Sequence, residues 1–194
     1  MASYGRNLDF RIPPAAENRK GRFVLTGTAG TSVALGAPVT YDSLTAAPTV
    51  FPGAQNVKLA TGAQAPIIGL SGILVYEHAP AAFAGDDPLL TFYSDKGTAP
   101  VGKLVQVVSD PDIKVVLRNI DAFTFLNTRD YAGRKMVAGL GGATPTIAVG
   151  DLLTPGTGDD TSGYWAETSD ATKAWLRVIE VDNTRQELEA QLLF

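Results

Sequence analysis

Two stretches of the chain repeat one short pattern, and this repetition limits the fold more than any single residue does. The first copy comprises residues 21–27 (GRFVLTG) and 33–40 (VALGAPVT), and the second comprises residues 133–139 (GRKMVAG) and 147–154 (IAVGDLLT). In each copy Gly-Arg opens an apolar segment, a glycine closes it, and a second apolar segment follows. Internal similarity of this kind indicates duplicated structural units. We therefore expect two related β units.

Short apolar segments separated by turn residues continue through the chain, which contains 20 glycines and 12 prolines. This spacing is typical of a β sandwich or barrel. The expected strands are residues 22–27, 37–41, 56–60, 66–76, 89–93, 101–108, 113–118, 134–138, 151–154, 163–166, 172–181 and 186–193. Helix is expected only as a turn or two at residues 79–84.

The C-terminal hairpin shows the strand pattern most clearly. Residues 172–181 are apolar on both faces, so this strand is expected in the middle of a sheet. In residues 186–194 the apolar side chains alternate with Glu187, Glu189 and Gln191, which is the period of a strand with one buried face.

The predicted fold class is all-β: a sandwich or barrel built from two related β units, with an extended N-terminal arm and little helix. The arm is assigned to residues 1–20, where two adjacent prolines oppose a helix. The first β unit is assigned to residues 21–118, a connector to residues 119–132, and the second β unit to residues 133–194.

The composition excludes several classes of protein. Of the 194 residues, 45% are hydrophobic, which is enough for a buried core. Only 19% are charged, which suits a protein packed against other subunits and equally an ordinary stable β domain. The chain has no cysteine, so disulfides and sulfur-ligated metals are excluded. No membrane span or secretory signal is recognisable, so we expect synthesis in a cytoplasm and no membrane partner.

Positive charge is concentrated in the arm. Five cations against two acids give residues 1–22 a balance of +3 and leave −7 for the rest of the chain. These cations are too widely spread for a usual phosphate-binding cluster, so we expect no direct contact with nucleic acid. Docking on an acidic protein surface and simple solvation both remain open. The candidate contact residues are Arg6, Arg11 and Arg19.

Residues suited to catalysis or metal binding are few. His78 is the only histidine, and no Gly-x-Ser-x-Gly segment presents a nucleophile, so we expect a surface or packing role for it. The Gly-rich residues 139–144 precede Pro145 rather than a helix, which favours a hairpin tip over a phosphate loop. Asp159 and Asp160 lack the ligand spacing of an EF-hand loop, which favours an ordinary turn over a cation site.

Aromatic side chains offer one further candidate site, a sugar-stacking face made by Tyr164, Trp165 and Trp175. The first two are adjacent in an expected strand and therefore point to opposite faces, so we expect core packing instead. We thus predict no catalytic, cofactor-binding or metal-binding residues and no cofactor.

The second copy continues in a definite order, from GDLLTPG at 150–156 to GYWA at 163–166 and WLRVIEV at 175–181. The first copy repeats this order in the segments GAPVT at 36–40, VKLA at 57–60, PIIGL at 66–70 and GKLVQV at 102–107. This order resembles the plan of small capsid decoration (cement) proteins of tailed bacteriophages. The loop at 79–100 and the connector at 119–132 depart from that plan.

The resemblance implies a non-enzymatic structural protein of the virion, made in the host cytoplasm and located on the capsid surface. Such a protein binds the outside of the assembled capsid and stabilises contacts between capsomers. The implied partners are the major capsid protein and further copies of the same chain, with a trimer favoured. A tail-tube or neck protein of a tailed phage is the alternative, and a β-barrel enzyme or ligand-binding module is a weaker one.

Overall fold

A computed structural model shows a nearly all-β protein, which confirms the predicted fold class. It describes residues 10–11, 20–34, 36–46, 53–75, 98–111, 113–119, 137–141, 143–157 and 163–194. The strands in these ranges are β1 (Phe10–Arg11), β2 (Lys20–Leu25), β3 (Ser32–Ala34), β4 (Pro38–Tyr41), β5 (Gln55–Leu59), β6 (Gly72–Val75), β7 (Thr98–Pro100), β8 (Leu104–Val108), β9 (Lys114–Arg118), β10 (Leu152–Pro155), β11 (Trp165–Thr168), β12 (Leu176–Asp182) and β13 (Glu187–Leu192). A short 3₁₀ helix, η3 (Ala171–Lys173), precedes β12.

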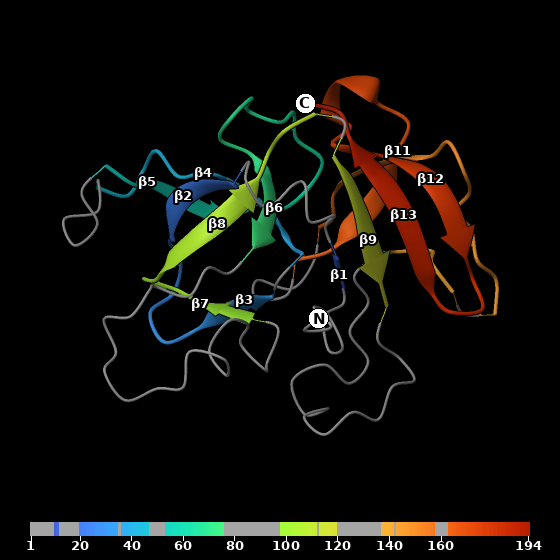
Figure 1. Cartoon of the computed structure of the whole chain (residues 1–194), viewed down its shortest axis with the longest axis horizontal. Coiled ribbons are helices and arrows are strands. Elements are labelled where there is room, and N and C mark those ends of the chain that lie inside the picture. Colours follow the sequence, from blue (N-terminus) through green and yellow to red (C-terminus); the bar gives the residue numbers. More distant parts are fainter. Residues whose placement is uncertain are drawn as a thin grey trace, which may run out of the picture.

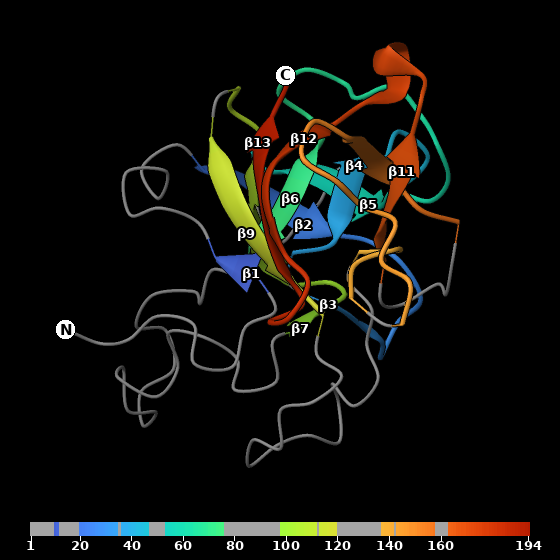
Figure 2. The same ribbon diagram turned by 90° about the vertical axis from the view of Figure 1, so that its right-hand side faces the viewer.

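These strands form a closed barrel and a six-stranded sheet that lie side by side (Figure 1). The barrel has the order β2-β5-β4-β6-β8, and the sheet has the order β1-β9-β13-β12-β10-β11. The short strands β3 and β7, which the sequence pattern does not predict, pair with each other. In Figure 2 the sheet is nearer the viewer, and β4 and β6 of the barrel lie behind it.

The barrel and the sheet repeat one pattern of strand pairing, so the chain contains two related β units. In the barrel, β4 pairs with β5 and β6, and β6 pairs with β8. In the sheet, β10 pairs with β11 and β12, and β12 pairs with β13. The registers also correspond, because Val39 lies opposite Gly72 in the barrel and Leu153 lies opposite Leu176 in the sheet. A Cβ on Gly72 would collide with the carbonyl oxygen of Val108, so this glycine permits the close approach of β6 and β8.

The same backbone hydrogen bond is found just before the first of the corresponding strands, β4 and β10, in each unit. The N–H of Gly36 donates to the oxygen of Leu74 at 3.0 Å, and the N–H of Gly150 donates to the oxygen of Val178 at 2.9 Å. Both glycines have positive φ, at 83° and 97°, which residues with a side chain rarely adopt. The glycine shared by the two sequence copies is therefore required by the same turn.

Strand β2 has a counterpart that consists of two separate segments. The first is β9, which pairs with β13 in the register that β2 has with β8: Leu117 opposite Leu188 corresponds to Phe23 opposite Val105. Strand β9, assigned above to the first unit, thus pairs within the sheet of the second unit.

The second segment of this counterpart begins at Val137. Strand β2 also pairs in parallel with β5, and Val137 forms the equivalent parallel bridge to Trp165. The N–H of Ala138 donates to the oxygen of Trp165 at 2.8 Å, as the N–H of Thr26 donates to the oxygen of Val57 at 2.7 Å. Most of the expected strand at 134–138, with its Gly-Arg pair, lies outside the described residues.

Asn119, directly after β9, joins the two segments. Its side chain is buried, and its Oδ1 accepts the N–H of Val137 at 2.9 Å. Its Nδ2 donates to the oxygen of Leu140 at 2.7 Å and to the oxygen of Val137 at 3.3 Å. A carboxamide offers the same donor and acceptor as a peptide group, so Asn119 holds the second segment at the end of β9 by hydrogen bonds, where β2 of the first unit is one continuous strand.

Within the described residues, one continuous hydrophobic core spans both units. The buried Trp165 of the second unit donates its Nε1–H to the oxygen of Gly36 in the first unit at 3.0 Å. Trp175, also buried, donates to the oxygen of Gln64 at 2.8 Å, and the two indole rings meet edge to face with centroids 5.9 Å apart. The prediction that the tryptophans belong to the core is confirmed. Tyr164 is half-buried, and its hydroxyl donates to the oxygen of Thr157.

The C-terminal hairpin agrees with the sequence pattern. Strand β12 pairs on both sides, with β10 and β13, and therefore lies inside the sheet as predicted. Leu188, Ala190 and Leu192 of β13 are buried, whereas the residues between them are half-buried. Residues 171–173, at the start of the expected strand 172–181, instead form η3, because the Asp170 carboxylate accepts the N–H of Thr172 and caps the turn.

The long strand expected at residues 66–76 is wrong in its first half. Only β6 is extended, and the preceding residues form a turn in which the oxygen of Ile67 accepts the N–H groups of Leu70 and Ser71 at 2.9 and 2.8 Å. Gly69 has a φ of 76° within this turn. The expected helix at 79–84 and the expected strand at 89–93 lie outside the described residues.

Candidate functional site

Of the arginines predicted to contact a partner, the structure describes only Arg11. Arg11 lies in β1, where its backbone pairs with Val116 of β9. At this point the arm therefore pairs with its own chain, although the sequence predicts contacts with a partner. The other candidates lie outside the described residues: Arg6, Arg19, His78, Asp159 and Asp160. In the Gly-rich segment after Ala138, the oxygen of Gly139 accepts the N–H groups of Thr146 and Ile147; among the described residues, no paired strands flank this segment as they would flank the predicted hairpin tip.

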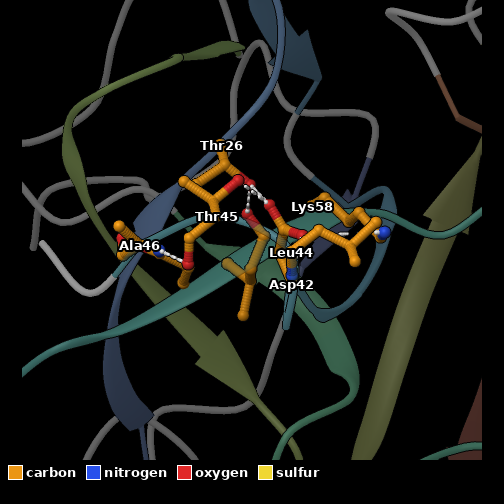
Figure 3. A network of polar contacts seen from close by, with 8 residues as sticks. Thr26, Asp42, Leu44, Thr45, Ala46 and Lys58 are labelled. Atoms are coloured by element: carbon orange, nitrogen blue, oxygen red, sulfur yellow. Dashed lines mark hydrogen bonds and ion pairs between the residues drawn. The ribbon is translucent and has the colours of Figure 1, made fainter.

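The densest polar cluster in the described structure surrounds Asp42, directly after β4 (Figure 3). The hydroxyls of Thr26 and Thr45 donate to its Oδ2 at 2.7 and 2.5 Å. The N–H of Leu44 donates to Oδ1 at 3.2 Å, and the Lys58 ammonium lies 3.7 Å from the same oxygen. Nearby, Asn56 donates to the oxygens of Thr45 and Ala46, which fixes the loop that follows β4.

These contacts keep the Asp42 carboxylate ionised although its side chain is only 7% exposed. Burial by itself raises the pKa of Asp42. The hydrogen bonds from Thr45, Thr26 and the N–H of Leu44, together with the charge of Lys58, outweigh burial and lower the pKa to about 2. A carboxylate with such a low pKa and with both oxygens bound is a poor general base, so the cluster is best explained as a structural anchor.

Sequence reasoning did not identify this cluster, since its members come from three separate segments. The one local signal is the Asp-x-x-Thr sequence at 42–45, which is typical of an Asx turn. The second unit does not repeat the cluster. The N–H of Asp42 donates to the oxygen of Asn56, and the corresponding donor and acceptor in the second unit are Gly156 and Tyr164.

The most exposed apolar pair in the described structure lies on the turn before β6. We call residues 66–71 the Ile67–Ile68 turn. The two isoleucines are 45% and 82% exposed. The hydroxyl of Ser71 accepts the N–H of Ile67 at 2.9 Å and lies 2.8 Å from the hydroxyl of Thr40, which is buried in β4. The turn is therefore fixed to the barrel and holds both isoleucines in solvent.

The C-terminal end of the chain lies near the segment that leads into this turn (Figures 1 and 2). Trp175 connects them: its indole donates to the oxygen of Gln64, and its own carbonyl oxygen accepts the N–H of Leu193 at 3.1 Å. Leu193 is 37% exposed, while the ring of Phe194 packs edge to face on Trp175 at 5.3 Å. This end of the molecule thus presents apolar side chains on a firmly held backbone, an arrangement suited to binding another protein.

Within the described residues, no three side chains of the metal-binding types gather into a group that would hold an ion. No helix of the described chain is long and apolar enough to cross a membrane. In comparisons with known proteins, no family model, curated protein or solved structure matches this chain.

Proposed function

We propose that this chain is a non-enzymatic structural protein of the virion that binds the outside of a phage capsid and stabilises contacts between capsomers. The observation that supports it best is the Ile67–Ile68 turn, which holds two apolar side chains in solvent on a backbone anchored to the barrel. A pre-ordered apolar contact loses little conformational entropy on binding, so its burial contributes more fully to affinity.

The magnitude is suited to an assembly with many copies. Complete burial of one isoleucine contributes about 1.5–3 kcal/mol, so a single turn gives a weak contact. Many such contacts on one shell, made by linked subunits, give high avidity without further interactions. Because the protein would bind the assembled shell better than free capsid subunits, it would stabilise the shell by mass action. The sequence resemblance to decoration proteins supports the same proposal, and the low charged fraction of 19% is compatible with it.

The test is binding of the purified protein to virus particles from which it has been removed. The double variant I67S/I68S should bind at least about tenfold more weakly, since tenfold corresponds to a loss of about 1.4 kcal/mol. The control is Leu44→Ser, at a side chain that is 87% exposed on a different loop and should not change binding. Equal binding by both variants would contradict the role of the turn.

Location in the particle tests the wider proposal. Antibody against this chain should label the head of intact particles in electron micrographs, at many sites per particle. Labelling confined to the tail would favour a tail-tube or neck protein. Absence of the chain from purified particles would overturn a virion function altogether.

A further inference from the structure

Strand β9, like its counterpart β2, is paired along only part of its second edge. Strand β2 pairs along one edge with β8 and along the other with three residues of β5. Strand β9 pairs along its whole length with β13, but its other edge pairs only with β1, at Val116 and Leu117. Among the described strands, none pairs with that edge at Lys114, Val115 or Arg118. A partly covered strand edge is a template for a segment from another chain.

The segment that covers this edge comes from the N-terminal arm. Phe10 lies opposite Leu117 and Arg11 lies opposite Val116, so β1 contributes a two-residue strand to the six-stranded sheet. The following strand β2 belongs to the barrel. Eight residues, 12–19, link these two strands along the chain. At about 3.3–3.6 Å per residue, such a link can extend to roughly 30 Å.

We propose that β9 is the acceptor strand for the arm of a second copy of this chain, so that copies exchange Phe10–Arg11 when they assemble. The contacts of β1 with β9 are the same whether the arm belongs to the same chain or to its neighbour, so exchange sacrifices none of them. Where many copies are held close together, the high local concentration compensates for the lost translational freedom. This inference concerns how copies of the chain contact one another in the homo-oligomer that the sequence resemblance implies. It does not depend on attachment to a capsid.

Because the chain contains no cysteine, single introduced cysteines can report the exchange without interference. Arg11 and Val116 are direct partners in the antiparallel register, at a separation that a disulfide can bridge. Chains carrying only Arg11→Cys are mixed and reassembled with chains carrying only Val116→Cys, then oxidised and separated on a non-reducing gel. A disulfide-linked heterodimer is expected, since this bond can form only between two chains.

Two controls make the result specific. Arg11→Cys mixed with Arg185→Cys, an exposed position in the turn after β12, should give at most a background of dimers. The double variant R11C/V116C in one chain should give linked dimers and larger species at high concentration, and closed monomers on dilution. If the double variant closes only within one chain at every concentration and the mixture gives no heterodimer, the arm stays on its own chain and the proposal is wrong. It is also wrong if no bond forms in either experiment.

Deletion of residues 2–11 provides a second measurement that needs no cysteine. It should lower the mass of the oligomer in light scattering while the barrel and sheet keep their circular dichroism spectrum. An oligomer of unchanged mass would overturn the exchange even if both cysteine variants failed to fold.

Discussion

The side chain of Asn119 holds the main chain of Val137, 18 positions further along, by two hydrogen bonds of 2.9 and 3.3 Å. In the first unit, the strand residue Leu25 forms part of an unbroken strand with a neighbour on each side. In the second unit, that single position is divided between Asn119, which continues β9 beside β13, and Val137, which bridges to Trp165. The buried carboxamide of Asn119 thus links two segments that correspond to one continuous strand in the first unit.

Replacing Asn119 with leucine should destabilise the protein strongly. The substitution keeps a side chain of similar size but removes the three hydrogen bonds to Val137 and Leu140. Leaving these buried groups without that partner should lower the free energy of unfolding by about 3 kcal/mol, measured by urea denaturation. The control is Asn183→Ala. Asn183 is exposed and accepts one hydrogen bond, from the N–H of Gly141, so this substitution should lower the free energy of unfolding by less than about 1 kcal/mol. Equal losses would show that Asn119 does not join the strand.

The interrupted strand should also tolerate a shorter connection. Since Asn119 and Val137 are hydrogen-bonded, a linker of about five Gly and Ser residues can replace residues 121–135 without moving either end. A shorter loop costs slightly less closure entropy, so the melting temperature should stay within a few degrees. The measurement is a thermal melt followed by circular dichroism. A variant without a cooperative transition would mean that the replaced segment is required for folding.

Asp42 should make the protein sensitive to acid. Its pKa is about 2 in the folded protein and 3.8 when unperturbed, so the unfolded state binds a proton more readily. The stabilisation is complete above pH 3.8 and is lost as the pH falls toward 2, with a total of roughly 2 kcal/mol. Urea denaturation between pH 2 and 6 should therefore show a smaller acid-dependent loss for Asp42→Asn than for the original protein. Asp170→Asn, at a carboxylate that is 43% exposed, is the control and should change the acid profile less.

Two equivalent threonines should respond in opposite ways to the same substitution. Thr40 in β4 shares a buried hydrogen bond with Ser71, whereas Thr154, its counterpart in β10, has a buried hydroxyl with no hydrogen-bond partner among the described residues. Thr40→Val should therefore lower the free energy of unfolding by about 1 kcal/mol, and Thr154→Val should raise it by a similar amount. Chemical denaturation of the two variants measures both effects. A loss of stability in Thr154→Val would indicate that its hydroxyl has a partner.

The features that local chemistry determines could be predicted from the sequence. The alternation in residues 186–194 identified the buried face of β13, and the repeated glycines at 36 and 150 marked one turn twice. The Ile67–Ile68 turn was mistaken for strand because its apolar residues match a strand pattern. Its actual conformation depends on Ser71, whose hydroxyl reaches back to the N–H of Ile67.

The candidate sites depended on contacts that no local pattern discloses. Thr26, Asp42 and Lys58 come from different segments, and only the barrel brings them together. The Gly-Arg repeat aligns residues 21–27 with residues 133–139, and so Leu25 with Val137. This match agrees with the structure, because both residues pair in parallel, Leu25 with Val57 and Val137 with Trp165. The pairing of β9 with β13 could not be read from that alignment, because it results from the interruption after Asn119.

The indole hydrogen bond from Trp165 to Gly36 has a consequence for how the molecule comes apart. Each unit contributes one member of a buried pair within a shared core, so separating the units would break this hydrogen bond and expose the apolar side chains around it to water. We therefore expect neither unit to fold stably without the other. Heating should therefore melt the whole chain in one step, and a break at either unit should release both.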